Sequence, residues 1–228
     1  MGITVINAQE ANTRAAAELT IGLLFALARR IAEADRSLRS GAWARSQLRG
    51  FELKNRRLGI CGLGRIGSEV ASLAQALGMH VEAYDPHHRA QQRAQALNIQ
   101  LHDNLESLLN RSEILTLHIP KAPETVGLIG KREIALLPRG ACILNAARGG
   151  LLDEEALIEA LDSGHLAGAA LDVFEQEPLP KDSPLLQRNQ ILCTPHIGAA
   201  THEAQTRVAD EIAVKILAFF EGKNSPLV

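Results

Sequence analysis

Aromatic side chains are scarce in this chain of 228 residues, which contains five Phe, one Tyr and one Trp. Proteins that bind single-stranded nucleic acid stack bases on aromatic rings, so this scarcity argues against such a role. The formal net charge of −2 gives no electrostatic reason to expect nucleic acid or an anionic membrane as a partner. We therefore expect neither nucleic acid nor a membrane as a partner.

Cysteines and long apolar runs are also few. Cys61, Cys142 and Cys193 lie far apart, each in or beside an apolar run, which predicts buried reduced thiols rather than a disulfide framework or a metal site. This pattern favours a cytoplasmic protein. The longest apolar run, residues 19–28, is too short to span a bilayer, and the charges around it are the wrong way round for a signal peptide.

Three glycines with G-x-G-x-x-G spacing follow a short apolar strand predicted at residues 58–61. Gly62 would let the chain turn out of the strand, Gly64 would let the backbone approach a pyrophosphate, and Gly67 would let helix and strand pack closely. The helix that follows would direct its first N–H groups at the phosphates. Asp85 ends the next predicted strand, at the spacing expected for the acid that binds the adenosine ribose. The sequence therefore predicts a dinucleotide site that prefers NAD to NADP, because Asp85 would repel a 2′-phosphate.

Strand and helix patterns alternate from residue 58 onward, and the strands are continuous apolar runs. Such runs are typical of a parallel sheet covered on both faces, so the predicted fold is a doubly wound α/β sheet. The predicted strands are residues 3–6, 58–61, 80–84, 114–117, 141–144, 166–171 and 191–193, of which the last six form this sheet. One long helix is expected from Asn12 or Thr13 to about Arg39, and an amphipathic helix from Thr201 to Glu221. Residues 42–56 are expected to be irregular, with Trp43 as either a subunit contact or a local packing anchor.

Three polar groups follow strands of the predicted sheet, at its carboxyl edge: Arg148, one of the acids Asp172, Glu175 and Glu177, and His196. Each alone would be read as an ordinary loop residue. Together they match what hydride transfer at a 2-hydroxy acid requires. The Arg would hold the substrate carboxylate, the His would take the hydroxyl proton, and the acid would stabilise the imidazolium.

With these residues in view, the chain resembles the D-2-hydroxyacid dehydrogenase family. The motifs that carry the resemblance are residues 62–67, 84–86, 117–120, 145–150, 172–178 and 195–198, in the family's order. Residues 12–13, 17–20 and 196–205 are most similar to the phosphoglycerate dehydrogenases of that family. A formate dehydrogenase of the same superfamily would carry Gln in place of Glu177.

The resemblance implies a Rossmann fold that binds NAD and a role for each residue of the site. Arg148 would bind substrate, Glu177 would be the partner acid of the histidine, and His196 would be the general acid and base. The implied cofactor contacts are Gly62, Gly64, Arg65, Ile66, Gly67, Asp85, Ile119, Pro120, Ala146, Asp172 and Gly198. No metal ligand is expected.

Family members begin with a flavodoxin-like lobe that closes over the cleft, and most of that lobe is absent from this sequence. We expect residues 8–196 to form the NAD-binding domain, and residues 1–7 and 197–228 to be remnants of the substrate domain. The final helix would then lack a partner for its apolar face, which predicts a homodimer or an exposed apolar surface. The leading hypothesis is the core of a dehydrogenase acting on 3-phosphoglycerate. A hydroxypyruvate or glyoxylate reductase, or an NAD(H)-sensing interaction protein of the co-repressor type, are alternatives.

Overall fold

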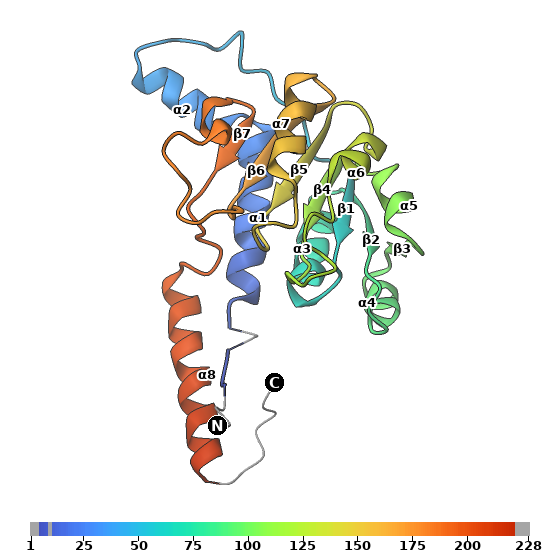
Figure 1. The fold of residues 1–228 in the computed structure, drawn as a ribbon, viewed down its shortest axis with the longest axis vertical. Helices are drawn as coiled ribbons and strands as arrows, with labels where there is room; N and C mark the ends of the chain where they lie inside the picture. Colours follow the sequence, from blue (N-terminus) through green and yellow to red (C-terminus); the bar gives the residue numbers. More distant parts are fainter. Residues whose placement is uncertain (1–4, 9–10, 222–228) are drawn as a thin grey trace.

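A seven-stranded parallel sheet forms the centre of the protein (Figure 1). The structure, a computed structural model, describes residues 5–8 and 11–221. The strand order is β3-β2-β1-β4-β5-β6-β7, and every pair is parallel. The strands are β1 (Arg57–Cys61), β2 (His80–Tyr84), β3 (Gln100–Leu101), β4 (Ile114–Leu117), β5 (Ala141–Asn145), β6 (Leu166–Leu171) and β7 (Ile191–Cys193).

Helices cover both faces of this sheet, which confirms the predicted doubly wound fold. One face carries α1 (Thr13–Ala28), α3 (Arg65–Ala76) and α4 (Ala90–Leu97), with α1 packed along α3. The other carries α5 (Leu105–Leu109), α6 (Lys131–Leu136) and α7 (Glu154–Asp162), with a short 3-10 helix, η1 (Pro184–Gln187), beside α7. The chain order reverses between β1 and β4, where open α/β sheets bind their ligands.

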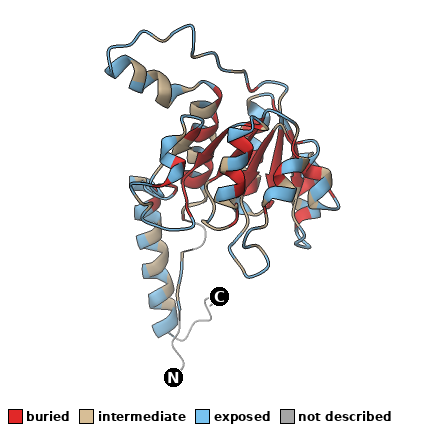
Figure 2. Ribbon diagram, turned by 45° about the horizontal axis from the view of Figure 1, so that its top comes forward, coloured by how far each residue is buried: buried red, intermediate tan, exposed pale blue. Residues whose placement is uncertain are grey.

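The strands are buried because both of their faces are covered (Figure 2). On one face strand side chains such as Leu115 and Ile143 share a core with Leu157 of α7. On the other face Ile60 of β1 shares a core with Val70 of α3. This double covering explains why the strands read as continuous apolar runs rather than alternating ones.

The predicted long helix after Thr13 is wrong in one respect, because it is two helices. Arg30 adopts a left-handed conformation (φ 51°) between α1 and α2 (Ile31–Arg39), and the chain changes direction there. The apolar stripe of α1 ends at the same place, since Leu23 is buried whereas Ile31 is 52% exposed. No glycine or proline marks this break, so the pattern of apolar residues alone extended the helix too far.

Two further differences concern strands. The two-residue β3 at the edge of the sheet was not predicted, because so short a segment has no readable periodicity. The predicted strand at residues 3–6 lies partly outside the described residues, and its described members, Val5 and Ile6, are not in a strand.

The two ends of the molecule carry exposed apolar side chains. At one end α8 (His202–Phe220) extends away from the sheet beside the amino-terminal segment, and Arg207 and Lys215 donate hydrogen bonds to the carbonyls of Ala11 and Asn7 (Figure 1). On its predicted apolar face Val208 and Ile212 are half-buried, whereas Ile216 and Phe219 are 40% and 42% exposed. At the other end residues 42–56 are irregular, as expected. Their Trp43 is 79% exposed and therefore is not a local packing anchor.

Candidate active site

The glycine turn connects β1 to α3 at the carboxyl edge of the sheet. Gly62 has φ 99°, and a Cβ there would lie 2.7 Å from the carbonyl of His118. A Cβ on Gly67 would lie 2.1 Å from the Gly62 oxygen, so helix and turn touch as predicted. Gly64 instead faces open space, with no atom within 4 Å of its Cβ position, and no side chain caps α3. The turn thus offers an open approach to the amino end of a helix, which fits the phosphates of a dinucleotide.

Asp85 lies directly after β2, beside this turn. Its carboxylate accepts hydrogen bonds from the backbone N–H groups of Leu63 and His87, both at 2.8 Å. One oxygen therefore braces the glycine turn, while the other orders the chain after the strand. The geometry fixes the negative charge next to the place where the adenosine ribose of a dinucleotide would lie.

Arg148 lies in the loop after β5 and is exposed. Asn145, the buried last residue of β5, holds this loop: its amide nitrogen donates to the Arg148 carbonyl at 3.0 Å, and its oxygen accepts from the Ala147 N–H at 3.1 Å. The Arg148 guanidinium donates to the Ala147 carbonyl. Asn145 has no role among the residues predicted from the sequence, although a polar residue at the end of an otherwise apolar strand is a signal that could have found it.

Glu177 and His196 form a direct pair. The Glu177 Oε2 lies 2.7 Å from the His196 Nδ1, and Oε1 accepts the Phe174 N–H at 3.0 Å. Burial alone would raise the pKa of Glu177, but the hydrogen bonds from His196 and Phe174 and the charge of Arg148 outweigh it. The pKa of this carboxyl therefore lies below its usual value, and the group is a carboxylate at neutral pH. With Nδ1 engaged, Nε2 is the ring nitrogen that can exchange a proton with a substrate.

Asp172, at the carboxyl end of β6, holds the loop that carries His196. Its side chain is almost fully buried, and it accepts hydrogen bonds from Thr194 Oγ1 (2.6 Å) and from the backbone N–H groups of Ile197 and Gly198 (2.9 Å each). His196 itself is left-handed, with φ 52°. The structure thus gives Asp172 a supporting position beneath the catalytic candidate, besides the cofactor contact that the resemblance implies.

Two further contacts join residues 149–154, which follow Arg148, to the loop that carries Glu177. A Cβ on Gly149 would lie 1.6 Å from the Phe174 carbonyl, so the two loops are in close contact. The Glu154 carboxylate, in the first turn of α7, accepts the Glu175 N–H at 2.7 Å. Burial raises the pKa of Glu154, and the nearby acids Glu175 and Asp153 add to this effect. From the sequence Glu154 reads only as a favourable acid at a helix start.

The remaining cofactor candidates lie along the same edge. Ile119 and Pro120 follow β4, Ala146 follows β5, and Ile66 and Arg65 begin α3. His118 lies 3.0 Å, through Nε2, from the Thr116 hydroxyl, and burial lowers its pKa to about 4. A neutral His118 is therefore not a second acid at this edge.

A cavity of about 680 Å³ lies beside the Glu177–His196 pair. Its other lining residues are mostly apolar: Phe174, Pro178, Leu179, Leu186, Cys193, Thr194 and Pro195. A hydrogen-bonded polar pair facing an apolar cavity of this size is typical of a site for a small organic molecule.

Residues 5–8 and 11–221 contain neither a candidate metal site nor a helix that could span a membrane. Within that part of the chain there is no group of three His, Cys, Asp or Glu side chains that could hold a metal ion. The helices there are all too short or too polar to cross a bilayer. The three cysteines are free thiols, and burial raises the pKa of Cys61 to about 12 and those of Cys142 and Cys193 to about 11.

The fold and these motifs match a known family over most of the chain. Residues 21–198 match the family described as "D-isomer specific 2-hydroxyacid dehydrogenase, NAD binding domain". The chain belongs to this family. The D-3-phosphoglycerate dehydrogenase of Methanocaldococcus jannaschii is 45% identical over 222 residues, which are 97% of this chain and 42% of that protein. The chain thus spans less than half the length of the curated relatives it matches.

Solved structures of dehydrogenases agree with this assignment. A D-isomer specific 2-hydroxyacid dehydrogenase from Polaromonas has a TM-score of 0.91 at 36% identity, covering 99% of this chain and 71% of that one. The NAD-dependent formate dehydrogenase from Staphylococcus aureus, solved with NAD, has a TM-score of 0.88 at 32% identity, covering 98% of this chain and 66% of that one. The cofactor of this dehydrogenase family domain is therefore NAD.

Proposed function

We propose that this chain is the NAD-binding and catalytic core of a D-2-hydroxyacid dehydrogenase whose substrate pair is 3-phosphoglycerate and 3-phosphohydroxypyruvate. The observation that supports catalysis most is the 2.7 Å contact between His196 and Glu177. It lies at the carboxyl edge of the sheet, where the glycine turn also lies, and the charge of Arg148 acts on Glu177.

In this proposal Arg148 holds the substrate. Its guanidinium can form two parallel hydrogen bonds with the C1 carboxylate, which fixes the position of C2. The Asn145 amide orders the loop from which Arg148 projects, so less conformational freedom is lost on binding.

His196 moves the proton. During oxidation its Nε2 accepts the proton of the C2 hydroxyl as hydride leaves C2, and during reduction it returns that proton. Glu177, on Nδ1, holds the ring in the required tautomer and stabilises the imidazolium. Bound NAD supplies the hydride acceptor, and Asp85 favours NAD over NADP because its charge opposes a 2′-phosphate.

The choice of substrate rests on the relatives. The curated relatives from Methanocaldococcus jannaschii and Mycobacterium leprae, at 45% and 46% identity, are D-3-phosphoglycerate dehydrogenases. Hydroxypyruvate and glyoxylate are the next candidates, and the latter is supported by a glyoxylate reductase structure with a TM-score of 0.90.

Replacing His196 tests the mechanism. His196→Asn keeps the size and polarity of the side chain but removes its basicity, so we expect turnover to fall by about 10²–10⁴. NAD affinity should stay within about twofold. NADH oxidation would be followed with 3-phosphohydroxypyruvate, hydroxypyruvate and glyoxylate, for this chain and for a chimera carrying the flanking regions of the Methanocaldococcus relative.

The outcome separates the enzyme from a sensing protein. Turnover that survives His196→Asn in the chimera would contradict the catalytic role. A protein partner that binds only with NADH present, in wild type and His196→Asn alike, together with no turnover of any of the three substrates, would favour a co-repressor-like switch.

We further propose that residues 8–196 are the NAD-binding domain and that residues 1–7 and 197–228 belong to the substrate domain. In support, α8 begins only after the His196 loop, extends from the sheet and runs beside the amino-terminal segment (Figure 1). A cytoplasmic location is part of this proposal, because free buried thiols suit a reducing compartment.

A homodimer is the proposed assembly, with the exposed Trp43 at its interface. Because Trp43 is the single Trp, its fluorescence reports on its own surroundings. We expect sedimentation to show a dimer and the emission to shift to shorter wavelength as concentration rises. Trp43→Ala should move the equilibrium towards monomer. A wild-type chain that stays monomeric at all concentrations would contradict the dimer, and a dimer unaffected by Trp43→Ala would contradict the placement of Trp43.

A further inference from the structure

The loop that carries Glu177 depends on hydrogen bonds for its shape. Residues 175–178 are all exposed, so burial does not hold them, whereas Phe174 before them is only 5% exposed. The Glu177 Oε1 accepts the Phe174 N–H at 3.0 Å, which leaves Oε2 for His196. The direction in which the Glu177 carboxylate points therefore depends on how the backbone at Phe174 is held.

The peptide bond between Phe174 and Glu175 is held from both sides. Its carbonyl oxygen lies so close to Gly149 that a Cβ there would be 1.6 Å away. Its N–H donates a hydrogen bond to the Glu154 Oε1 at 2.7 Å. Because a peptide bond is planar, these two contacts fix the orientation of the whole unit. The Phe174 N–H that binds Glu177 belongs to the neighbouring peptide unit, so its direction is set as well.

Glu154 lies on a well-anchored element. It is in the first turn of α7, whose side chains Leu157 and Leu161 are buried in the core. Asp153 caps this helix by accepting the Ala156 N–H at 2.9 Å, and α7 packs on both β6 and η1. A side chain on a packed helix holds its partner more precisely than a side chain on a loop does. Glu154 is therefore a fixed point to which the mobile side of the site is attached.

Glu154 lies near the catalytic pair but behind it. Burial and, to a smaller extent, the charge of Glu154 raise the pKa of Cys193 to about 11, and Cys193 lines the cavity beside His196. Glu154 is not among the described residues that line this cavity. Its carboxylate binds the loop instead, so any effect on the reaction passes through that loop.

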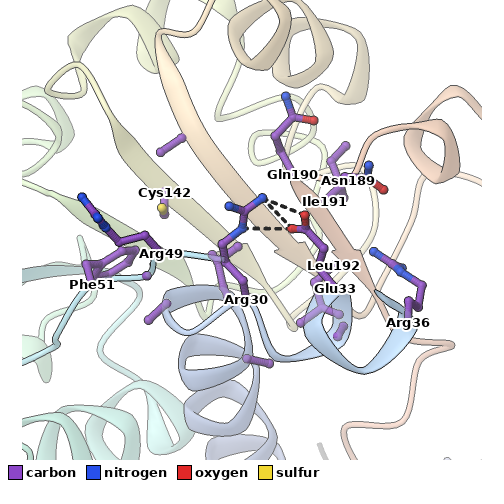
Figure 3. A pocket seen from close by; sticks show the side chains of 16 residues that line it. Arg30, Glu33, Arg36, Arg49, Phe51, Cys142, Asn189, Gln190, Ile191 and Leu192 are labelled. Carbon is purple, nitrogen blue, oxygen red and sulfur yellow. Dashed lines mark hydrogen bonds and ion pairs between the residues drawn. The ribbon is translucent and has the colours of Figure 1, made fainter. Parts of the chain in front are cut away.

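The favourable effect of an acid at the start of a helix does not account for this arrangement. Glu33, in the first turn of α2, shows the usual contact of such an acid, because it accepts hydrogen bonds of 2.9 and 2.8 Å from the nearby Arg30 (Figure 3). Glu155 is exposed in the first turn of α7 and has the same benefit from the helix dipole. Glu154 instead binds the Glu175 N–H, 21 residues along the chain, and this contact brings the carboxylates of Glu154 and Glu175 close enough to interact.

We propose that Glu154 is a positioning residue for the reaction. It fixes the Phe174–Glu175 peptide, which sets the orientation of Glu177 and, through Glu177, that of the His196 ring. Because Gly149 directly follows Arg148, the same peptide also fixes the substrate-binding loop relative to Glu177. This inference rests on the proposed dehydrogenase function.

Turnover and NAD binding of the chimera test this with three variants. Glu154→Ala removes the acceptor, so we expect kcat to fall about tenfold while the Kd of NAD stays within about twofold, because only the catalytic pair is displaced. Glu154→Gln keeps an acceptor oxygen at the same reach and should restore kcat to within about threefold of wild type. Glu155→Ala is the matched control: it removes an acid from the same helix turn and should leave kcat unchanged.

A double-mutant cycle separates positioning from a general loss of structure. If Glu154 acts through Glu177, then Glu154→Ala should change kcat by less than about twofold once Glu177 is already alanine. A loss as large in the Glu177→Ala background as in wild type would show that Glu154 acts elsewhere, and would overturn the proposal. Equal losses in Glu154→Ala and Glu155→Ala would overturn it as well.

Nitrogen NMR of labelled histidine in the full chain gives a readout that needs no turnover. The His196 signals are identified by their absence from the spectrum of His196→Asn. We expect the Nδ1 shift, which reports the hydrogen bond to Glu177, to change in Glu154→Ala and to return in Glu154→Gln. An Nδ1 shift that is the same in wild type and Glu154→Ala would overturn the proposal. A shift that responds to Glu154→Ala, with a wild-type chimera that turns over none of the three substrates, would support the positioning role and contradict the dehydrogenase function.

Discussion

At the scale of single residues, Asp172 has two candidate roles: a contact with the cofactor, and support of the loop that carries His196. The family resemblance implies that this residue contacts the cofactor. In the structure its oxygens accept hydrogen bonds from Thr194, Ile197 and Gly198. Hydrogen bonds of this kind depend on the path of a loop 22 to 26 residues further along the chain, which no local pattern encodes.

Asp172→Asn should therefore lower turnover more than it weakens NAD binding. The new amide nitrogen cannot accept a hydrogen bond, so the loop loses at least one of its anchors and His196 shifts. We expect kcat to fall by about tenfold to a hundredfold, because a displacement near 1 Å has effects of this size. The measurement is kcat for the chimera, with the Kd of NAD from fluorescence titration. A Kd raised tenfold at unchanged kcat would show that the cofactor contact is the role that matters.

The buried ring of His118 should make the stability of the folded chain depend on pH. Its pKa in the folded chain is about 4, against an ordinary value of 6.5, because burial disfavours the charged ring. As pH falls below about 6.5, the unfolded chain binds a proton that the folded chain refuses, so stability falls until pH reaches about 4. His118→Asn should lose less stability than wild type between pH 7.5 and pH 5, by about 1–2 kcal/mol.

Urea unfolding at the two pH values measures this difference. His80→Asn, at an exposed position of β2, is the control and should follow wild type. Identical pH dependence in wild type and His118→Asn would contradict the burial argument for His118.

At the scale of elements, the glycine turn was the most predictable part of the site. Its motif is local, and each glycine has a separate physical reason that the structure shows: the positive φ of Gly62, the open space at Gly64 and the close approach at Gly67. The α1–α2 break was not predictable in the same way. Arg30 holds its left-handed conformation through contacts with Glu33 and Gln47, and the second of these is tertiary.

Gly64→Ala should weaken NAD binding without lowering stability, whereas Gly67→Ala should lower stability. Gly64→Ala meets no atom within 4 Å, so its free energy of unfolding should change by less than about 0.5 kcal/mol, while the added methyl group blocks the phosphates and weakens NAD binding. Gly67→Ala forces a Cβ to within 2.1 Å of the Gly62 oxygen and should cost about 1–3 kcal/mol of stability. Urea unfolding and NAD titration of both variants check this. Full NAD affinity in Gly64→Ala would contradict the placement of the pyrophosphate.

At the scale of the whole molecule, the sequence predicted the fold class and the six longer strands of the sheet. The continuous apolar runs made this possible, since each run needed only its own residues to be recognised. The contacts between the loops after β5, β6 and β7 were harder to predict from the sequence. The resemblance pairs Glu177 with His196, but the contacts of Gly149 with Phe174 and of Glu154 with Glu175 join distant segments and appear only in three dimensions.

The exposed apolar face of α8 also belongs to this scale. The sequence predicted that the apolar face of this helix would lack a partner. On that face Ile216, Phe219 and Phe220 are between 40% and 81% exposed, while Val208 and Ile212 are half-buried. An exposed row of this kind is unusual on a protein surface and indicates contact with another surface. In the proposed domain division that surface belongs to the substrate domain.

The central claim is that the nicotinamide of NAD and the C2 of a 2-oxo acid meet beside His196. A crystal structure of this chain with NAD and oxamate, an unreactive 2-oxo acid mimic, tests it most directly. The account predicts the pyrophosphate over Gly64, the oxamate carboxylate on the Arg148 guanidinium, and the His196 Nε2 within hydrogen-bonding distance of the oxamate carbonyl oxygen. A nicotinamide ring at the amino edge of the sheet, or oxamate bound away from both Arg148 and His196, would contradict it.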